Sequence, residues 1–130
     1  MNKQPPPTLA ILVPVFNEAE VLGRFYEQLS NILTTLPNPH WIYFIDDGST
    51  DQTPEILKAL AGGDETIRLI TLSRNFGHQA ALSCGIDHAE GDILITMDGD
   101  GQNPPEIIPE MLTLYQSGYD IVIGQRQPDS

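Results

Sequence analysis

The sequence has little cysteine, little positive charge and no long apolar segment. Its 130 residues include one cysteine, Cys84, which excludes an internal disulfide and a cysteine-based zinc site. Six Lys and Arg stand against 18 Asp and Glu, for a formal net charge of −12. The basic residues are scattered along the chain, so no patch would attract a phosphate backbone. We therefore expect no nucleic-acid partner.

The longest apolar run covers residues 9–16 and contains Pro14, whereas a helix needs about 20 apolar residues to cross a bilayer. The N-terminus is polar and rich in proline, so we expect no signal peptide. The length predicts one domain, with 1–8 a disordered segment, 9–126 the domain and 127–130 a tail. The lone cysteine fits a reducing cytosol. We expect a cytoplasmic protein, or one on the cytoplasmic face of the membrane in a longer parent.

Short apolar segments alternate with amphipathic ones, which predicts strands alternating with helices. The predicted strands cover residues 9–15, 41–45, 67–72, 93–97 and 120–123. The predicted helices cover residues 18–33, 53–63, 79–89 and 104–116. This order favours right-handed crossovers and a mostly parallel sheet between two layers of helices. The expected fold class is therefore a three-layer α/β/α fold.

Polar and glycine-rich segments follow every predicted strand. They are residues 17–18, 46–51, 73–78, 98–102 and 124–126. The loops before the strands show no comparable concentration of polar side chains. Because ligands bind at the carboxyl ends of parallel strands, the sequence predicts a binding site at that edge of the sheet.

Asp98 and Asp100 lie two residues apart in an extended segment, a spacing that lets both carboxylates point the same way. With Gln102 they offer hard oxygen donors that suit Mg²⁺ or Mn²⁺ shared with a diphosphate. The alternative is a cap for the helix that begins near Pro104, since acidic and polar residues commonly precede a helix.

Two further groups of charged residues lie at the same edge. The segment 46–51 suits hydrogen bonds to a base or ribose, or else a plain turn. Asp46 and Asp47 would stand close to other carboxylates, which favours a bound cation. Arg74 and Arg126 are suited to phosphate, with salt bridges to the aspartates as the alternative.

Two other reactive side chains receive structural interpretations. We interpret His78 as the start of a helix rather than as a catalyst. We interpret Cys84 as a small core residue rather than as a reactive thiol.

Five motifs occur in order with matching strand contexts. They are P-V-F-N-E at 14–18, D-D-G-S-T-D at 46–51, S-R-N-F-G at 73–77, D-G-D-G-Q-N-P-P-E at 98–106 and G-x-R at 124–126. Together they resemble the inverting family-two glycosyltransferases, and within them the polyprenyl- and dolichyl-phosphate sugar synthases. The S-R-N-F-G segment resembles the bacterial, bactoprenol glucosyltransferase-like branch.

The resemblance implies a GT-A fold and transfer of a hexose, with inversion, from a nucleoside-diphosphate sugar to a polyprenyl or dolichyl phosphate. It favours a UDP-sugar, with GDP-mannose as the alternative. It implies Mg²⁺ or Mn²⁺ as cofactor. The residues it implies as donor-binding are Pro14, Asn17, Glu18, Asp46, Asp47, Arg74 and Asp98. Those it implies as catalytic are Asp98, Asp100 and Arg126, and as metal ligands Asp98, Asp100 and Gln102.

Two departures from the family pattern bear on these expectations. Gly99, Gly101 and Asn103 stand where the family commonly has bulkier residues or Asp. The family's members also run well beyond 200 residues, so by this resemblance the chain is a truncated donor-binding portion. The acceptor site and the membrane contact would lie in the missing C-terminal part. The exposed sheet edge would favour a homo-oligomer.

Four other classes of protein share some features with this sequence. A receiver domain needs a Lys after the fifth strand, and none follows Lys58. A dinucleotide-binding enzyme needs glycines directly after the first strand, and Gly23 is the first in the chain. A sugar nucleotidyltransferase would show a glycine-rich first loop with a lysine. A non-catalytic nucleotide-binding module fits the same residues and differs only in turnover.

Overall fold

The computed structural model describes residues 5–99 and 104–116 of the chain. Strands and helices alternate through them as predicted. The strands are β1 (Leu9–Val15), β2 (His40–Asp46), β3 (Ile67–Thr71) and β4 (Ile93–Thr96), and the helices are α1 (Ala19–Leu33), α2 (Thr53–Gly63), α3 (His78–His88) and α4 (Ile108–Gln116), with a 3₁₀ turn η1 (Pro105–Ile107) before α4. The predicted strand at 120–123 lies outside the described residues, as do Asp100, Gln102 and Arg126.

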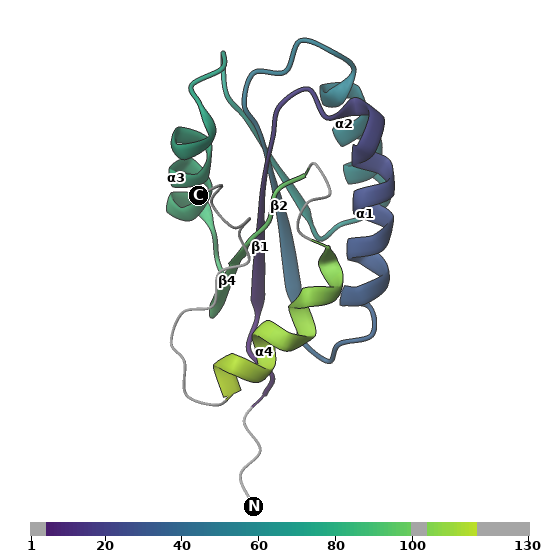
Figure 1. The fold of residues 1–130 in the computed structure, drawn as a ribbon, viewed down its shortest axis with the longest axis vertical. Helices are drawn as coiled ribbons and strands as arrows, with labels where there is room; N and C mark the ends of the chain where they lie inside the picture. Colours follow the sequence, from purple (N-terminus) through teal and green to yellow (C-terminus); the bar gives the residue numbers. More distant parts are fainter. Residues whose placement is uncertain (1–4, 100–103, 117–130) are drawn as a thin grey trace, which may run out of the picture.

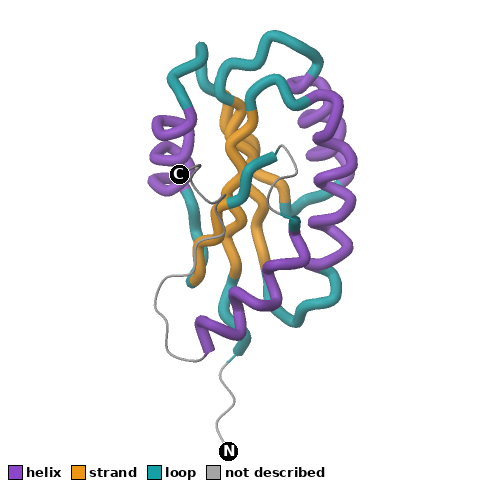
Figure 2. Tube along the Cα trace, viewed as in Figure 1, coloured by secondary structure: helices purple, strands orange, loops and turns teal. Residues whose placement is uncertain are grey.

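The described strands form one parallel sheet in the order β3-β2-β1-β4 (Figures 1 and 2). Leu9 of β1 aligns with His40 of β2 and with Ile93 of β4. β1, β2 and β3 are consecutive neighbours in the sheet, and β4 then lies on the other side of β1. Right-handed crossovers require such a reversal to change the face of the sheet that carries the connecting helix.

Both faces of the sheet are covered, and the alternation of side chains along β1 shows how. Leu9, Ile11, Val13 and Val15 pack in one core with residues of α1, α2 and α4. Ala10 and Leu12 pack in a second core that includes Ala81 of α3. Figure 1 shows α1 and α2 on one side of the sheet and α3 on the other. The three-layer α/β/α prediction is therefore confirmed.

The helix predicted over 104–116 is not continuous, because η1 precedes α4. Pro104 and Pro105 lack the N–H groups that an α-helical turn uses, and the Ile107 N–H donates to the Pro104 carbonyl in the tighter 3₁₀ pattern. The α-helix begins at Ile108, with Pro109 in its first turn, where proline is tolerated.

The interpretation of Cys84 as a core residue is wrong. Ala81 and Gly85 are the buried residues of α3, and a side chain at Gly85 would collide with Ile45 of β2. Leu82 also packs against the second core, so the face of α3 that meets the sheet is centred on Ala81 and Gly85. Cys84 is therefore half-buried beside this face, with its sulfur 3.8 Å from His88 Nδ1.

Candidate functional site

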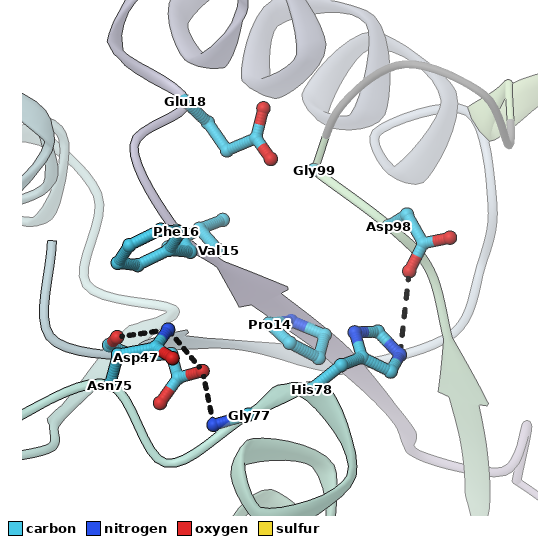
Figure 3. A pocket seen from close by; sticks show the side chains of 10 residues that line it. All are labelled: Pro14, Val15, Phe16, Glu18, Asp47, Asn75, Gly77, His78, Asp98 and Gly99. Atoms are coloured by element: carbon cyan, nitrogen blue, oxygen red, sulfur yellow. Dashed lines mark hydrogen bonds and ion pairs between the residues drawn. The ribbon is translucent and has the colours of Figure 1, made fainter.

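A cavity of about 430 Å³ opens at the carboxyl edge of the sheet, at the ends of the neighbouring strands β1 and β4. This is the point at which the strand order reverses, the usual position of ligands in open parallel sheets. The cavity lies within the size range of small-molecule sites. Its lining residues, drawn in Figure 3, are Pro14, Val15, Phe16, Glu18, Asp47, Asn75, Gly77, His78, Asp98 and Gly99.

The end of β1 enters the cavity through a tight turn. Pro14 is buried, while Phe16 is 41% exposed. Asn17 has a positive φ of 52°, which turns the chain toward α1. The Glu18 N–H donates to Thr53 Oγ1 over 2.9 Å, and the Glu18 side chain extends toward the opening beside Gly99 (Figure 3).

Asp47 joins the β2–α2 loop to the β3–α3 loop. It is 3% exposed, and its carboxylate accepts hydrogen bonds from the N–H groups of Phe76 (2.8 Å) and Gly77 (3.0 Å). Asn75 Nδ2 donates to the same carboxylate over 3.1 Å. Donors from the protein therefore compensate this buried charge.

Asp46 lies just outside the cavity and also has a protein donor. It is 2% exposed, and its Oδ1 accepts a hydrogen bond from the Ser49 N–H over 3.0 Å. Donors from the protein therefore contact Asp46 as they do Asp47, and the cation expected near them stays a prediction, because Asp100 and Gln102 lie outside the described residues. Within them, no group of three or more acidic, histidine or cysteine side chains could hold a metal.

Arg74 lies beside Asp46 in a second hollow, which shares Phe16 and Asn75 with the cavity. Its guanidinium stacks 4.3 Å from the centre of the Phe76 ring. Among residues 5–99 and 104–116, the structure has no salt bridge from Arg74 to an aspartate. The salt-bridge alternative is thus not found there, and the guanidinium remains exposed at the rim.

Asp98 and His78 face each other across the β4 side of the cavity. His78 Nε2 lies 3.7 Å from Asp98 Oδ1, as Figure 3 shows. His78 is the first residue of α3, so its prediction as a helix start is confirmed. Its approach to Asp98 was not predicted, because it depends on how α3 crosses the sheet.

Glycine at two positions lets the loops of the site approach one another. Gly48 has a φ of +74°, and a Cβ there would overlap the backbone of Arg74 and Asn75. A Cβ on Gly99 would lie 2.7 Å from Val15 Cγ1, inside the contact distance of two carbons. Larger residues would push apart the β2 and β3 loops in the first case and the ends of β1 and β4 in the second.

Asp51 lies at the same edge, in the loop between β2 and α2. Its carboxylate accepts hydrogen bonds from Thr53 and from the Ala19 N–H. These bonds, the one from the Thr53 side chain above all, lower the pKa of Asp51 below its ordinary value. The charge of Asp51 therefore helps to tie the β2–α2 loop to the start of α1.

Sequence reasoning missed Phe16, Asn75 and Gly77 as lining residues. Asn75 and Gly77 belong to a motif that was recognised, but only its arginine was singled out. Asp47 is the signal that could have identified them. A carboxylate at the end of a buried strand needs hydrogen-bond donors, and a neighbouring loop can supply them.

Residues 10–130 match the sequence profile described as "Glycosyl transferase family 2". The chain belongs to this family. Within the described part of this family member, no helix is both long and apolar enough to span a membrane.

Two curated relatives of this family member match most of its sequence. The bactoprenol glucosyl transferase of Shigella phage SfV is 40% identical over 94% of the chain. The undecaprenyl-phosphate 4-deoxy-4-formamido-L-arabinose transferase of Yersinia enterocolitica is 40% identical over 88% of it. These matches cover 40% and 35% of the relatives, respectively. The chain thus spans well under half of their length.

A solved structure shares the fold. The mannosyltransferase of Pyrobaculum calidifontis, solved in complex with GDP-Man and Mn²⁺, superposes with a TM-score of 0.64 at 24% identity. The match covers 73% of this chain and 28% of that one. The expected GT-A fold is confirmed by this similarity.

Proposed function

We propose that this edge of the sheet is the donor site of a glycosyltransferase that uses a nucleoside-diphosphate sugar. The observation that carries the proposal is the position of Asp98, which lies in the cavity at the reversal of strand order. It is supported by membership of glycosyl transferase family 2. It is also supported by the nucleotide-sugar complex of the mannosyltransferase with the same fold.

The proposed donor contacts divide between two hollows. Pro14, Glu18 and Asp47 line the cavity beside Asp98, where the diphosphate and sugar would bind. Asp46 and Arg74 line the neighbouring hollow, where the nucleoside would bind. Phe16 and Asn75 line both hollows, which are therefore adjacent, and we propose that one extended ligand occupies them together.

A divalent cation is part of the proposal. Asp98 carries a carboxylate, 23% exposed, at the mouth of the cavity, which fits the oxygen donors that Mg²⁺ and Mn²⁺ prefer. We propose Asp100 and Gln102, which lie outside the described residues, as the other protein ligands. When bound, the cation would neutralise charge on the leaving diphosphate. Arg126, also outside the described residues, is proposed to contact phosphate.

The acceptor is proposed from the relatives. Bactoprenol and undecaprenyl phosphate occur in the names of two of them, which supports a polyprenyl phosphate acceptor. We propose the cytoplasmic face of a membrane as the site of action. We propose transfer with inversion and favour a UDP-sugar over GDP-mannose. Since the chain spans 35 to 40% of these relatives, we propose that it supplies the donor and metal site and transfers sugar slowly or not at all alone.

Calorimetry with UDP and GDP, each with and without Mn²⁺, tests the donor site. We expect Mn²⁺-dependent binding of one nucleotide. Asp98→Ala should weaken it by about tenfold or more, as loss of a metal ligand does. Asp92→Ala is the matched control. Asp92 precedes β4, at the end of the strand opposite to Asp98, and the Asp92 carboxylate accepts a hydrogen bond from the Thr8 N–H.

Two results would overturn the donor-site proposal. One is that the wild-type chain binds neither nucleotide. The other is that Asp92→Ala and Asp98→Ala weaken binding equally. A non-catalytic nucleotide-binding module would give the same binding, so a second assay separates it. This assay uses a longer protein that contains this chain and measures transfer of the sugar from the nucleotide-sugar donor to a polyprenyl phosphate. Such transfer would exclude a non-catalytic module.

A further inference from the structure

Asn17 lies in the turn between β1 and α1, between two residues that line the cavity. We propose that Asn17 is a positioning residue, which acts on the donor through Glu18 rather than by binding the nucleotide itself. The proposal rests on the proposed donor site and differs from the role that the family resemblance implies for Asn17.

The side-chain oxygen of Asn17 is already used by the protein. Asn17 Oδ1 accepts hydrogen bonds from the N–H groups of Thr50 (2.8 Å) and Asp51 (3.2 Å) in the β2–α2 loop. In the opposite direction, the Asn17 N–H donates to Ser49 Oγ over 2.9 Å. The two loops are therefore joined by reciprocal hydrogen bonds centred on one residue.

The backbone at Asn17 also favours this residue type. Its φ of 52° is the only positive value for a residue other than glycine within the described chain. Asparagine tolerates this left-handed conformation better than most residues. The turn it makes directs the next N–H, that of Glu18, onto the buried Thr53 Oγ1. Asn17 thus fixes the backbone that carries Glu18 into the cavity.

The side chain of Asn17 borders a different hollow from the one assigned to the diphosphate. Asn17 lines a depression together with Glu18, Asp51 and Gln52, and of these residues Glu18 alone also lines the cavity that contains Asp98. Its position outside the cavity argues for a role in holding the loops.

Two substitutions separate positioning from ligand binding. Asn17→Asp keeps a carbonyl-type oxygen for the two N–H donors and tolerates the positive φ, but it removes the amide donor. Asn17→Gly keeps the positive φ and removes the oxygen. Gln52→Glu is a matched control for the added charge, because Gln52 is exposed in the same depression.

The readouts are Mn²⁺-dependent UDP or GDP affinity and hydrogen exchange of the Thr50 and Asp51 amides. We expect Asn17→Gly to weaken binding and to speed exchange of both amides, each by about tenfold. Asn17→Asp should keep the amides protected and match Gln52→Glu in affinity within about twofold at moderate salt.

The proposal is overturned if Asn17→Asp binds nucleotide as weakly as Asn17→Gly while its amides stay protected, since the amide group would then contact the donor. It is also overturned if exchange is unchanged in Asn17→Gly. If the wild-type chain binds neither nucleotide, the proposed function fails. The hydrogen exchange of the Thr50 and Asp51 amides in wild type and Asn17→Gly then decides by itself whether Asn17 holds the two loops.

Discussion

Aspartate carboxylates have different structural roles at the two edges of the sheet. At the amino edge, Asp92 accepts a hydrogen bond from the Thr8 N–H, just before β1. At the carboxyl edge, Asp47 accepts hydrogen bonds from Phe76 and Gly77 in a loop that lines the cavity. The Asp92 carboxylate therefore joins the starts of β1 and β4. The Asp47 carboxylate instead holds a loop that lines an open cavity.

The difference follows from the topology. β4 lies next to β1 along its length, with Leu9 to Leu12 aligned to Ile93 to Thr96. Beyond these residues β1 leads to α1 and β4 to α4 on one face of the sheet, whereas β3 leads to α3 on the other face, so the loops that line the cavity leave toward different faces. Loops at the carboxyl edge must therefore be held by side chains across a gap. Substitutions at the amino edge should lower stability alone, whereas those at the carboxyl edge should also lower nucleotide affinity.

The largest effect is expected for Asp47→Ala. It removes the acceptor of two backbone N–H groups and of Asn75 Nδ2. We expect unfolding free energy to fall by about 2 to 3 kcal/mol, the usual range for hydrogen bonds to a charged group. Urea denaturation measures this change, and calorimetry with UDP or GDP and Mn²⁺ should show binding weakened by about tenfold or more.

Asp92→Ala is the amino-edge counterpart of Asp47→Ala. Within the described residues, the Asp92 carboxylate accepts one hydrogen bond, from the Thr8 N–H, so we expect a loss of at most about 1 kcal/mol and unchanged nucleotide affinity. If Asp47→Ala were destabilised yet bound nucleotide as the wild type does, the carboxyl-edge loops would not depend on Asp47 for their shape.

The glycines that flank β4 sharpen the same comparison. A Cβ at Gly99 would lie 2.7 Å from Val15 Cγ1, and one at Gly91 would lie 3.0 Å from Ala10 Cβ. We expect Gly99→Ala and Gly91→Ala each to cost about 1 to 2 kcal/mol through overpacking. Only Gly99→Ala should weaken nucleotide binding, because it separates the ends of β1 and β4 at the cavity.

Gly23→Ala is the control for the alanine substitution itself. Gly23 lies exposed in α1, with nothing within 4 Å of its added Cβ. Alanine should stabilise this helix by about 0.5 to 1 kcal/mol. Thermal unfolding and nucleotide calorimetry on the three variants decide the comparison. Equal loss of affinity in Gly91→Ala and Gly99→Ala would show that the two ends of β4 are not distinct in function.

The sequence predicted the layers of the fold because each strand is short, apolar and followed by a helix of clear periodicity. It predicted the edge that carries the cavity because polar residues follow the strands. Helix boundaries near prolines were less accurate, since Pro104 and Pro105 lack N–H groups and shorten the first turn. The face of α3 was misjudged at Cys84 because small residues, Ala81 and Gly85, are the ones buried.

The hydrogen bonds of single side chains could not be predicted from motif position. The roles expected for Asn17 and Asp47 at a nucleotide stay predictions, and the structure shows that both side chains join protein loops. Such bonds depend on the distance between loops that are about 30 residues apart in the chain, as Asp47 and Gly77 are. The contact of His78 with Asp98 has the same origin.

A small effect, confined to stability, is expected at Asp64 on the amino edge. Burial opposes its charge, but hydrogen bonds from Thr66 and Tyr26 prevail and lower the pKa of Asp64 below its ordinary value of 3.8. Because the folded pKa is lower than the unfolded one, the contribution of Asp64 to stability is present above about pH 4 and disappears as pH falls through the folded pKa. Asp64→Asn should lower unfolding free energy by about 1 kcal/mol at pH 7.

Urea denaturation of wild type and Asp64→Asn between about pH 6 and pH 3 measures this contribution. The two stabilities should converge as the pH falls, and nucleotide affinity at neutral pH should be the same in both proteins. Parallel pH profiles would mean that the bonds from Thr66 and Tyr26 do not favour the ionised form. A loss of nucleotide affinity in Asp64→Asn would instead show that the two edges of the sheet are coupled, and the division between stability and binding would fail.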